Sequence, residues 1–373
     1  MIPNKEALLA LPARLGLRAV VMMSPENFAY ASGSNVITVR LIRPRHGYVM
    51  ITPAGAELIV CSIEKTLVEA ESWIDAITVY TEFVDKPVAV LAARLKAQGI
   101  DSGRVGIDLD YLNKVAFDDL RALLPNVEWV NTTEDVAAIR AVKTADEVAM
   151  LKMATCATHR AVLDAMAGST LGDTEAQMAR RIMDGMLEGG ADGVLFLCFA
   201  SGDRTDQPHA HATDRVPGPG ELIRFDVGAT WGAWASDFAR TYSTGEPTQL
   251  QRDTYRKLSE IQQETIEFIK PGVTAESIFE TCKAGYEKRG LRFHMPHIGH
   301  SFGLELHESP MLRPGEKTVI TEGMVLNIEP IVIDEKRGTY HLEDLVEVTS
   351  DGTRLLTLGL APREIPTIGT KIG

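Results

Sequence analysis

The chain has 373 residues, more than one hydrophobic core usually serves, so two domains are expected. Its hydrophobic fraction of 45% and charged fraction of 24% are ordinary for a folded globular protein and exclude an intrinsically disordered one. A net charge of -13 excludes nucleic acid and anionic membranes as expected partners, because phosphate groups are bound by clustered Lys and Arg.

Residues 1–15 lack the basic start and unbroken apolar core of a signal peptide. No stretch reaches the roughly 18 apolar residues of a membrane span, so a cytoplasmic protein is expected.

The first part of the chain predicts an α/β domain. Between Leu17 and about Val130, strand-like runs alternate with helical patterns, which is typical of an α/β fold. The predicted strands include 18–22, 47–51, 57–61 and 104–107, and the predicted helices include 87–98 and 111–124.

The second part predicts an α+β domain, with the boundary between Asn131 and Lys143. Thr144-Ala-Asp-Glu147 is a capping-box sequence that opens a long helix toward Met166. Further helical patterns cover 174–187, 250–269 and 275–288. Between and after them, strand-like runs with Gly and Pro turns follow Gly190, so helices are grouped apart from strands.

This strand-rich part contains five potential metal ligands, Asp226, Asp237, His300, Glu329 and Glu343. Four carboxylates and one imidazole have too few nitrogens and too much negative charge for a structural zinc site. They suit two divalent cations held close together, which indicates metal-assisted hydrolysis.

Two of the carboxylates lie in what we interpret as a hairpin, with strands at 223–230 and 233–242 and a tight turn at Trp231-Gly232. This turn predicts Asp226 directly opposite Asp237, with Cβ atoms roughly 5 Å apart on one face. Strand aspartates often face solvent, but both of these lie among apolar neighbours, where an unpaired buried carboxylate is costly. The pair is therefore predicted to bridge two cations.

The other three ligands interrupt apolar or glycine-rich runs. Glu329 and Glu343 each break an apolar strand-like segment, and a carboxylate there needs a cationic partner, of which a metal is one kind. His300 lies seven residues before His307, between Gly299 and Gly303, so a loop or strand is expected rather than the helix of an HExxH motif. His307 is expected to reach the site separately.

These motifs resemble the creatinase and aminopeptidase P family of pita-bread metallopeptidases, which includes methionine aminopeptidase and prolidase. The segments that carry the resemblance are Ser24-Pro-Glu-Asn27, Ile139-Arg-Ala-Val-Lys143, Phe225-Asp-Val-Gly228, Ser236-Asp237, Gly299-His300, Ile328-Glu-Pro330 and Leu342-Glu-Asp344. They occur in the family's order and spacing over essentially the whole chain. The resemblance implies an N-terminal α/β creatinase-like domain at 1–135 and a pita-bread catalytic domain at 140–373. A homodimer is expected as well.

The resemblance also implies roles for the metal ligands. Asp226 and Glu329 would hold different cations, Asp237 and Glu343 would bridge both, and His300 would complete one site. The two cations would be manganese, cobalt, zinc or iron, since carboxylate-rich sites accept each of them. A metal-bridging water or hydroxide would be the nucleophile, and Glu329 would accept its proton.

Three further histidines are assigned to the substrate side. His209 matches the family's substrate-side histidine, and His307 matches the one that stabilises the tetrahedral intermediate. His341 stands where proline-specific relatives usually have arginine, two residues before the last glutamate ligand, which weakens the expectation that a free substrate carboxylate is recognised. His297 is three residues before His300, where many relatives space these histidines four apart, and His211 is expected to be exposed.

The predicted function is removal of the N-terminal residue of a peptide, or cleavage of a dipeptide, with Xaa-Pro as the preferred substrate. One alternative is hydrolysis of a small non-peptide amide or C–N bond, as in creatinase or ectoine hydrolase. Another is a catalytically silent binding protein on the same fold. Both alternatives predict that some metal ligands have been lost, whereas all five are present here. The N-terminal domain carries none of the proposed ligands and is expected to narrow access to the site and to support the homodimer.

Overall fold

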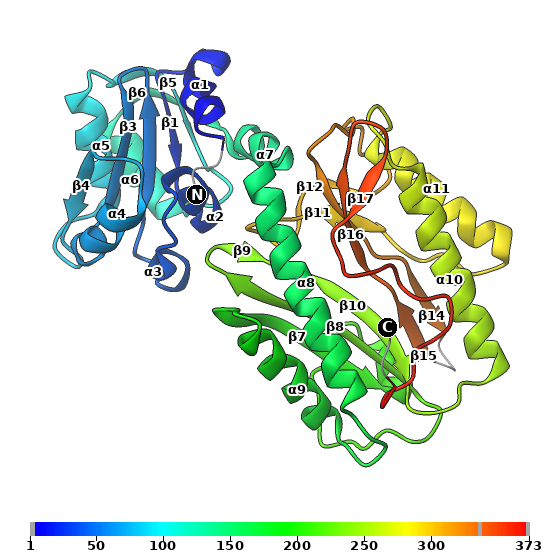
Figure 1. The fold of residues 1–373 in the computed structure, drawn as a ribbon. Helices are drawn as coiled ribbons and strands as arrows, with labels where there is room; N and C mark the ends of the chain where they lie inside the picture. Colours follow the sequence, from blue (N-terminus) through cyan, green and yellow to red (C-terminus); the bar gives the residue numbers. More distant parts are fainter. Residues whose placement is uncertain (1–3, 335–337, 371–373) are drawn as a thin grey trace. The chain divides into compact units, whose positions relative to one another are not determined.

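The computed structural model describes residues 4–334 and 338–370. The chain forms two compact units, Met1–Arg140 and Ala141–Gly373 (Figure 1). The described part of the first unit contains one six-stranded mixed sheet in the order β4-β3-β2-β1-β5-β6. Its strands are β1 (Ala19–Met22), β2 (Tyr48–Thr52), β3 (Gly55–Cys61), β4 (Ile77–Tyr80), β5 (Ser102–Ile107) and β6 (Asn126–Asn131). Its helices are α1 (Lys5–Leu15), α2 (Pro25–Ser32), α3 (Ile37–Leu41), α4 (Lys65–Glu71), α5 (Pro87–Ala97) and α6 (Lys114–Leu123).

Helices α5 and α6 cover one face of this sheet. Pro87 occupies the first turn of α5, where its missing N–H costs nothing, and the Asn113 side chain caps α6 by accepting from the Ala116 N–H at 3.0 Å. Leu91 and Leu120 pack with the buried strand residues of this face. The strands and helices predicted in this part of the sequence are confirmed to within three residues at each end.

The second unit contains a four-stranded sheet with the order β10-β8-β7 and β9 paired to β8, a five-stranded sheet with the order β12-β11-β13-β16-β17, and the pair β14-β15, within the described ranges. The strands are β7 (Gly193–Ser201), β8 (Leu222–Trp231), β9 (Trp234–Ala235), β10 (Phe238–Ser243), β11 (Gly299–Ser301), β12 (Glu308–Met311), β13 (Val325–Ile328), β14 (Ile331–Asp334), β15 (Gly338–His341), β16 (Asp344–Val348) and β17 (Thr353–Leu355). Following α7 (Thr133–Ala141), the helices are α8 (Ala145–Ala167), α9 (Glu175–Glu188), α10 (Gln249–Phe268) and α11 (Ala275–Arg289).

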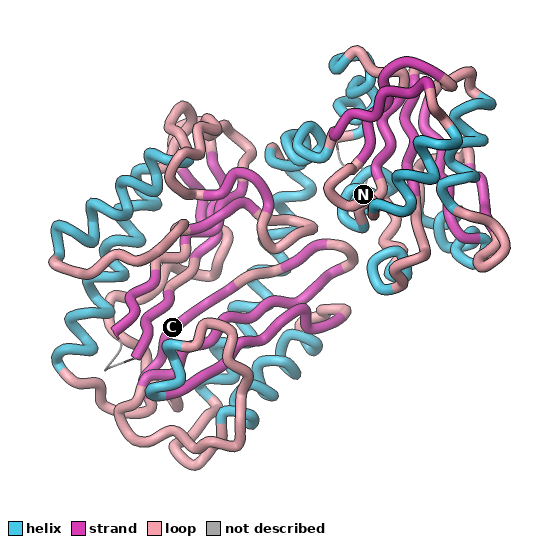
Figure 2. Tube along the Cα trace, turned by 180° about the vertical axis from the view of Figure 1, so that it is seen from behind, coloured by secondary structure: helices cyan, strands magenta, loops and turns pink. Residues whose placement is uncertain are grey.

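Two helix pairs cover the sheets of this unit from outside. Val162 of α8 and Ile182 of α9 share a core with Phe225 of the first sheet, whereas α10 and α11 share a core with the second sheet. Figures 1 and 2 show the strands lying between these helix pairs. The predicted α/β domain followed by an α+β domain is therefore confirmed.

The helix ends of this unit follow from local sequence. The Thr144 hydroxyl accepts from the Glu147 N–H at 3.3 Å, and Glu147 accepts from the Thr144 N–H at 2.6 Å, so the predicted capping box is confirmed. Gly290 ends α11 in the left-handed region. Across 4–334 and 338–370, no helix combines the length and the apolar character needed to cross a membrane.

Candidate metal centre

Two of the predicted ligands come from the β8–β10 hairpin, but its register differs from the prediction. Asp226 was predicted to lie directly opposite Asp237; instead it pairs with Ala239, so the prediction is wrong. Trp231 pairs with Trp234, which makes Gly232-Ala233 the turn. Gly232 has a φ of 62° at the first turn position, where a tryptophan side chain would be strained. Since Asp237 precedes Ala239 by two residues, the aspartates are diagonal rather than direct neighbours.

Three of the predicted ligands form a tight, buried cluster. Asp237, His300 and Glu343 each offer one ligand atom, and these atoms all lie within 4.8 Å of one another. Asp237 directly precedes β10, His300 lies on β11 and Glu343 lies between β15 and β16, so both large sheets contribute. The His300 Nε2 atom is 3.7 Å from Asp237 Oδ2. The tertiary fold therefore brings together groups from three distant segments.

The remaining two predicted ligands lie beside this cluster. Glu329 directly follows β13, and its Oε1 atom is 3.4 Å from His300 Nε2. Asp226 is outside the three-residue cluster, but its charge raises the pKa of Asp237 and of Glu329. All five predicted ligands thus belong to one electrostatically connected group.

The carboxylates repel one another strongly. Burial, followed by the charges of Asp226 and Glu329, raises the pKa of Asp237 well above its ordinary value. Burial and the neighbouring carboxylates raise the pKa of Glu343 in the same way. Burial, with Asp226, raises the pKa of Glu329 to about 8. Full ionisation of this group therefore requires compensating positive charge.

The donor atoms fit divalent cations. His300 Nδ1 lies 3.0 Å from the Ser301 carbonyl oxygen, and the N–H that it donates there leaves the Nε2 lone pair directed at the carboxylates. Burial lowers the pKa of His300 to about 3, so the ring is neutral, as a ligand must be. Glu329 Oε1 and Glu343 Oε2 are buried without a hydrogen-bond partner within the described part of the chain. Asn327 Nδ2 donates to the other oxygen of Glu343 and orients it.

Two further histidines lie against this group. The His307 ring centroid is 4.2 Å from that of His300 and 5.9 Å from that of His297. His297 Nδ1 lies 3.4 Å from Glu329 Oε1, so His297, whose role the sequence left open, reaches the site. Burial raises the pKa of Asp226, and Arg224 and then His209 oppose this rise, so the exposed His209 lies on the Asp226 side. His211 is exposed, as expected.

His341 is joined to the site by an arginine that sequence reasoning missed. Arg224 is 4% exposed and donates to His341 Nδ1 at 3.1 Å, so the proton of the neutral ring is on Nε2. That Nε2 atom is 3.3 Å from Glu329 Oε2. Arg224 also lies 3.7 Å from Asp226 Oδ2. The sequence did contain a signal for this arginine. Arg224 is two positions before Asp226, and residues two apart on a strand point to the same face, so the two side chains could have been predicted to lie side by side.

A second missed arginine links the segments that carry Asp237 and Glu343. Arg240 of β10 is 3% exposed, donates to the Glu343 carbonyl oxygen and donates to Asp344 Oδ1 at 2.5 Å. The Asp344 carboxylate also accepts from the Ala361 N–H at 3.0 Å. Arg240 follows Asp237 by three residues, so its contacts join the two segments that carry the proposed bridging ligands.

Comparison with known proteins shows similarity over most of the chain. The family model of metallopeptidase family M24 matches residues 139–350, and that of the creatinase/prolidase N-terminal domain matches residues 5–142. An Xaa-Pro dipeptidase of Pyrococcus horikoshii is 29% identical over 344 residues, 91% of this chain and 92% of that protein. An Xaa-Pro dipeptidase of Lactobacillus helveticus is 30% identical over 279 residues, 73% of this chain and 75% of that protein.

Solved structures show the same similarity. The crystal structure of dipeptidase PepE from Mycobacterium ulcerans superposes with a TM-score of 0.85 at 26% identity, covering 97% of this chain and 96% of that one. The likeness therefore extends over both units.

Proposed function

The chain belongs to metallopeptidase family M24, and from that membership we propose that it is a dinuclear metal-dependent peptidase that removes the N-terminal residue from Xaa-Pro dipeptides or short Xaa-Pro peptides. The observation that carries the proposal is the buried cluster of Asp237, His300 and Glu343 with Glu329 beside it. The two relatives that are named Xaa-Pro dipeptidases support the preference for proline.

We assign five residues to the two cations. Asp237 and Glu343 would serve both cations, Asp226 and Glu329 would each serve a different one, and His300 would complete one site. The unpartnered oxygens of Glu329 and Glu343 support this assignment. Manganese, cobalt, zinc and iron all suit such a donor set. The homodimer and the cytoplasmic location stay predictions.

The chain's own residues supply proton transfer and orientation. When bound, the two cations lower the pKa of a water molecule to near neutrality and polarise the scissile carbonyl group. Glu329 accepts the proton of that water at a carboxylate oxygen. His341 Nε2, which faces Glu329 Oε2 at 3.3 Å, restricts the orientation of this carboxylate.

His307 and His209 act on the substrate in this proposal. The His307 ring lies against the His300 ring, so a donor nitrogen of His307 can reach a carbonyl oxygen held beside the cations. His209 lies on the Asp226 side, where an exposed imidazole can contact the substrate. In this proposal, both histidines stabilise charge that develops during hydrolysis.

The Arg224–His341 pair supports recognition of a short substrate. Arg224 places a positive charge behind His341, and a positive end of the site attracts the carboxylate of a dipeptide. We therefore place His341 on the substrate side. This part of the proposal predicts that blocking the substrate's C-terminal carboxylate slows cleavage.

The test is metal analysis combined with a substrate panel. Protein loaded with manganese, cobalt, zinc or iron would be assayed on Leu-Pro, Leu-Pro-amide and Leu-Ala. We expect about two metal ions per chain, with Leu-Pro cleaved fastest. Equal rates on Leu-Pro and Leu-Ala would contradict proline preference, and no turnover of any peptide by fully metal-loaded protein would refute the peptidase proposal.

A further inference from the structure

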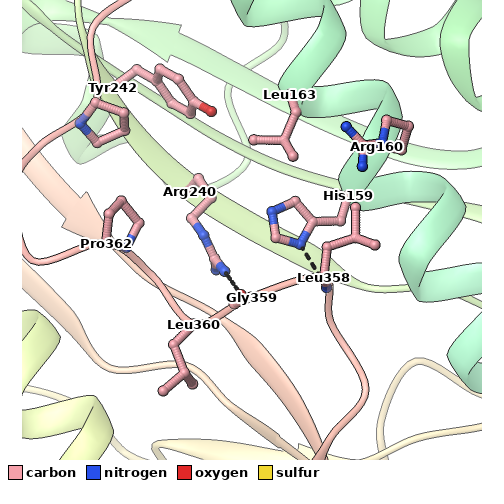
Figure 3. Close-up of a pocket in the computed structure, with 10 residues that line it drawn as sticks. His159, Arg160, Leu163, Arg240, Tyr242, Leu358, Gly359, Leu360 and Pro362 are labelled. Carbon is pink, nitrogen blue, oxygen red and sulfur yellow. Dashed lines mark hydrogen bonds between the residues drawn. The ribbon is translucent and has the colours of Figure 1, made fainter. Parts of the chain in front are cut away.

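A cavity of about 270 Å³ lies on the face of β10 opposite to Asp237. His159 and Arg160 of α8 and Arg240 and Tyr242 of β10 line it (Figure 3). The C-terminal segment adds Leu358, Gly359, Leu360, Pro362 and Pro366. Side chains alternate along a strand, so Arg240 and Tyr242 face α8 whereas Asp237 faces the metal cluster. The cavity is therefore separate from the candidate metal centre.

Two largely buried side chains have donor atoms that point into this cavity without partners in the described part of the chain. His159 is 6% exposed, and its Nδ1 atom accepts from the Leu358 N–H at 3.3 Å. Burial, with the charges of Arg240 and Arg160, lowers the pKa of His159 to about 2, so the ring is neutral and its proton is on Nε2. Tyr242 is 2% exposed. Within the described ranges, neither His159 Nε2 nor the Tyr242 hydroxyl has a hydrogen-bond partner.

The charged side chains that line the cavity are both arginines, Arg160 and Arg240. Arg160 lies at the exposed rim and forms no ion pair with any described residue, and no acidic side chain lines the cavity. Arg240 already pairs with Asp344, so Arg160 is the lining arginine without an ion pair among the described residues. Solvent reaches both donor atoms inside the cavity, and an acceptor that bears negative charge can replace that solvent with charge-assisted hydrogen bonds.

The rest of the lining is apolar. Leu163, Leu360 and Pro362 also line the cavity (Figure 3). A ligand that fills it needs a small apolar body as well as an anionic end. An ammonium group would find no carboxylate there, which disfavours zwitterionic amino acids, including those that a dipeptidase releases.

We propose that this cavity binds a small organic monocarboxylate with an apolar body and no positive charge. Its carboxylate accepts from Arg160, from His159 Nε2–H and from the Tyr242 hydroxyl, and its apolar body packs against Leu163 and Pro362. The site is independent of the proposed peptidase activity, because none of these groups lies on the face of β10 that holds Asp237.

The first test compares three ligands of the same shape and different charge. Isothermal titration of the metal-loaded protein would use benzoate, benzamide and benzylamine. We expect benzoate to bind about tenfold or more tightly than benzamide, the scale of a hydrogen bond to a charged group, and benzylamine not to bind. Equal affinity for the three ligands, or no binding of benzoate, would overturn the proposal.

The second test locates the binding, because a carboxylate could also coordinate the cations. Tyr242→Phe removes only the hydroxyl, and Arg160→Gln removes only a rim charge, so both variants should fold. Each should weaken benzoate binding about tenfold while metal content stays unchanged. Lys152→Gln removes the same charge from an exposed position of α8 outside the cavity and should leave the affinity unchanged. Wild-type affinity in both cavity variants would assign benzoate to the metal centre and overturn the site.

Discussion

Glu329 is predicted to destabilise the metal-free protein as pH rises. Burial, with the charge of Asp226, raises its pKa to about 8 from an ordinary value near 4.5. A carboxyl with a higher pKa in the folded state keeps its proton there after the unfolded chain has lost it. The folded state then binds more protons, so the free energy of unfolding falls as pH rises from about 4.5 to about 8. The difference corresponds to at most about 5 kcal/mol.

Glu329→Gln keeps the shape of the side chain and removes the ionisation. In the presence of a chelator, we expect the variant to gain stability relative to wild type as pH rises from 5 to 8. At roughly 2–4 °C per kcal/mol for a domain of this size, the gain in Tm should be several degrees at pH 8. Thermal unfolding followed by calorimetry at several pH values measures it.

Two controls make this prediction decisive. Glu322→Gln neutralises an exposed carboxylate, so the difference between this variant and wild type should stay constant over the same pH range. Saturating manganese should stabilise wild type by roughly 3 kcal/mol at a hundredfold excess over Kd, and should stabilise Glu329→Gln less. If the gap between metal-free Glu329→Gln and wild type stayed constant or narrowed from pH 5 to 8, the electrostatic reasoning would be wrong.

Three further predictions concern individual side chains. Asp237→Ala should release both cations and abolish activity together, since a bridging carboxylate serves both; full activity with two metals bound would contradict the assignment. His307→Ala and His209→Ala should each lower kcat/KM by roughly 10² or more, while the metal content stays near two ions per chain. The control His211→Ala changes an exposed histidine and should match wild type. If either of the first two variants lost stability but kept its turnover per folded molecule, that histidine would have a packing role instead. Arg240→Met should weaken metal binding about tenfold, because the guanidinium joins the segments that carry both proposed bridging ligands. Equilibrium dialysis measures the affinity. Wild-type affinity in the variant would mean that Arg240 only packs against its neighbours.

Local rules explain which elements the sequence predicted. The capping box at Thr144 and the helix periodicity that follows it depend on neighbours within four residues, and α8 formed as expected. The same holds for α5 and for strands β1, β2, β3 and β5 of the first sheet. The predicted register of the β8–β10 hairpin was wrong because shifting the turn by one residue changes every residue pair across the strands. The observed turn needs a positive φ at its first position, and Gly232 supplies it.

The sequence by itself determined the chemistry of this protein: carboxylates and histidines in apolar runs, where an uncompensated charge is too costly, indicated a metal site before any contact was known. The tertiary structure decided the supports of that site. Arg224 meets His341 across 117 residues, and Arg240 meets Asp344 across 104, in pairs that no periodicity reveals. Such contacts depend on how the sheets pack. Packing brings together residues that are far apart in the sequence, and the sequence around one residue does not indicate the other.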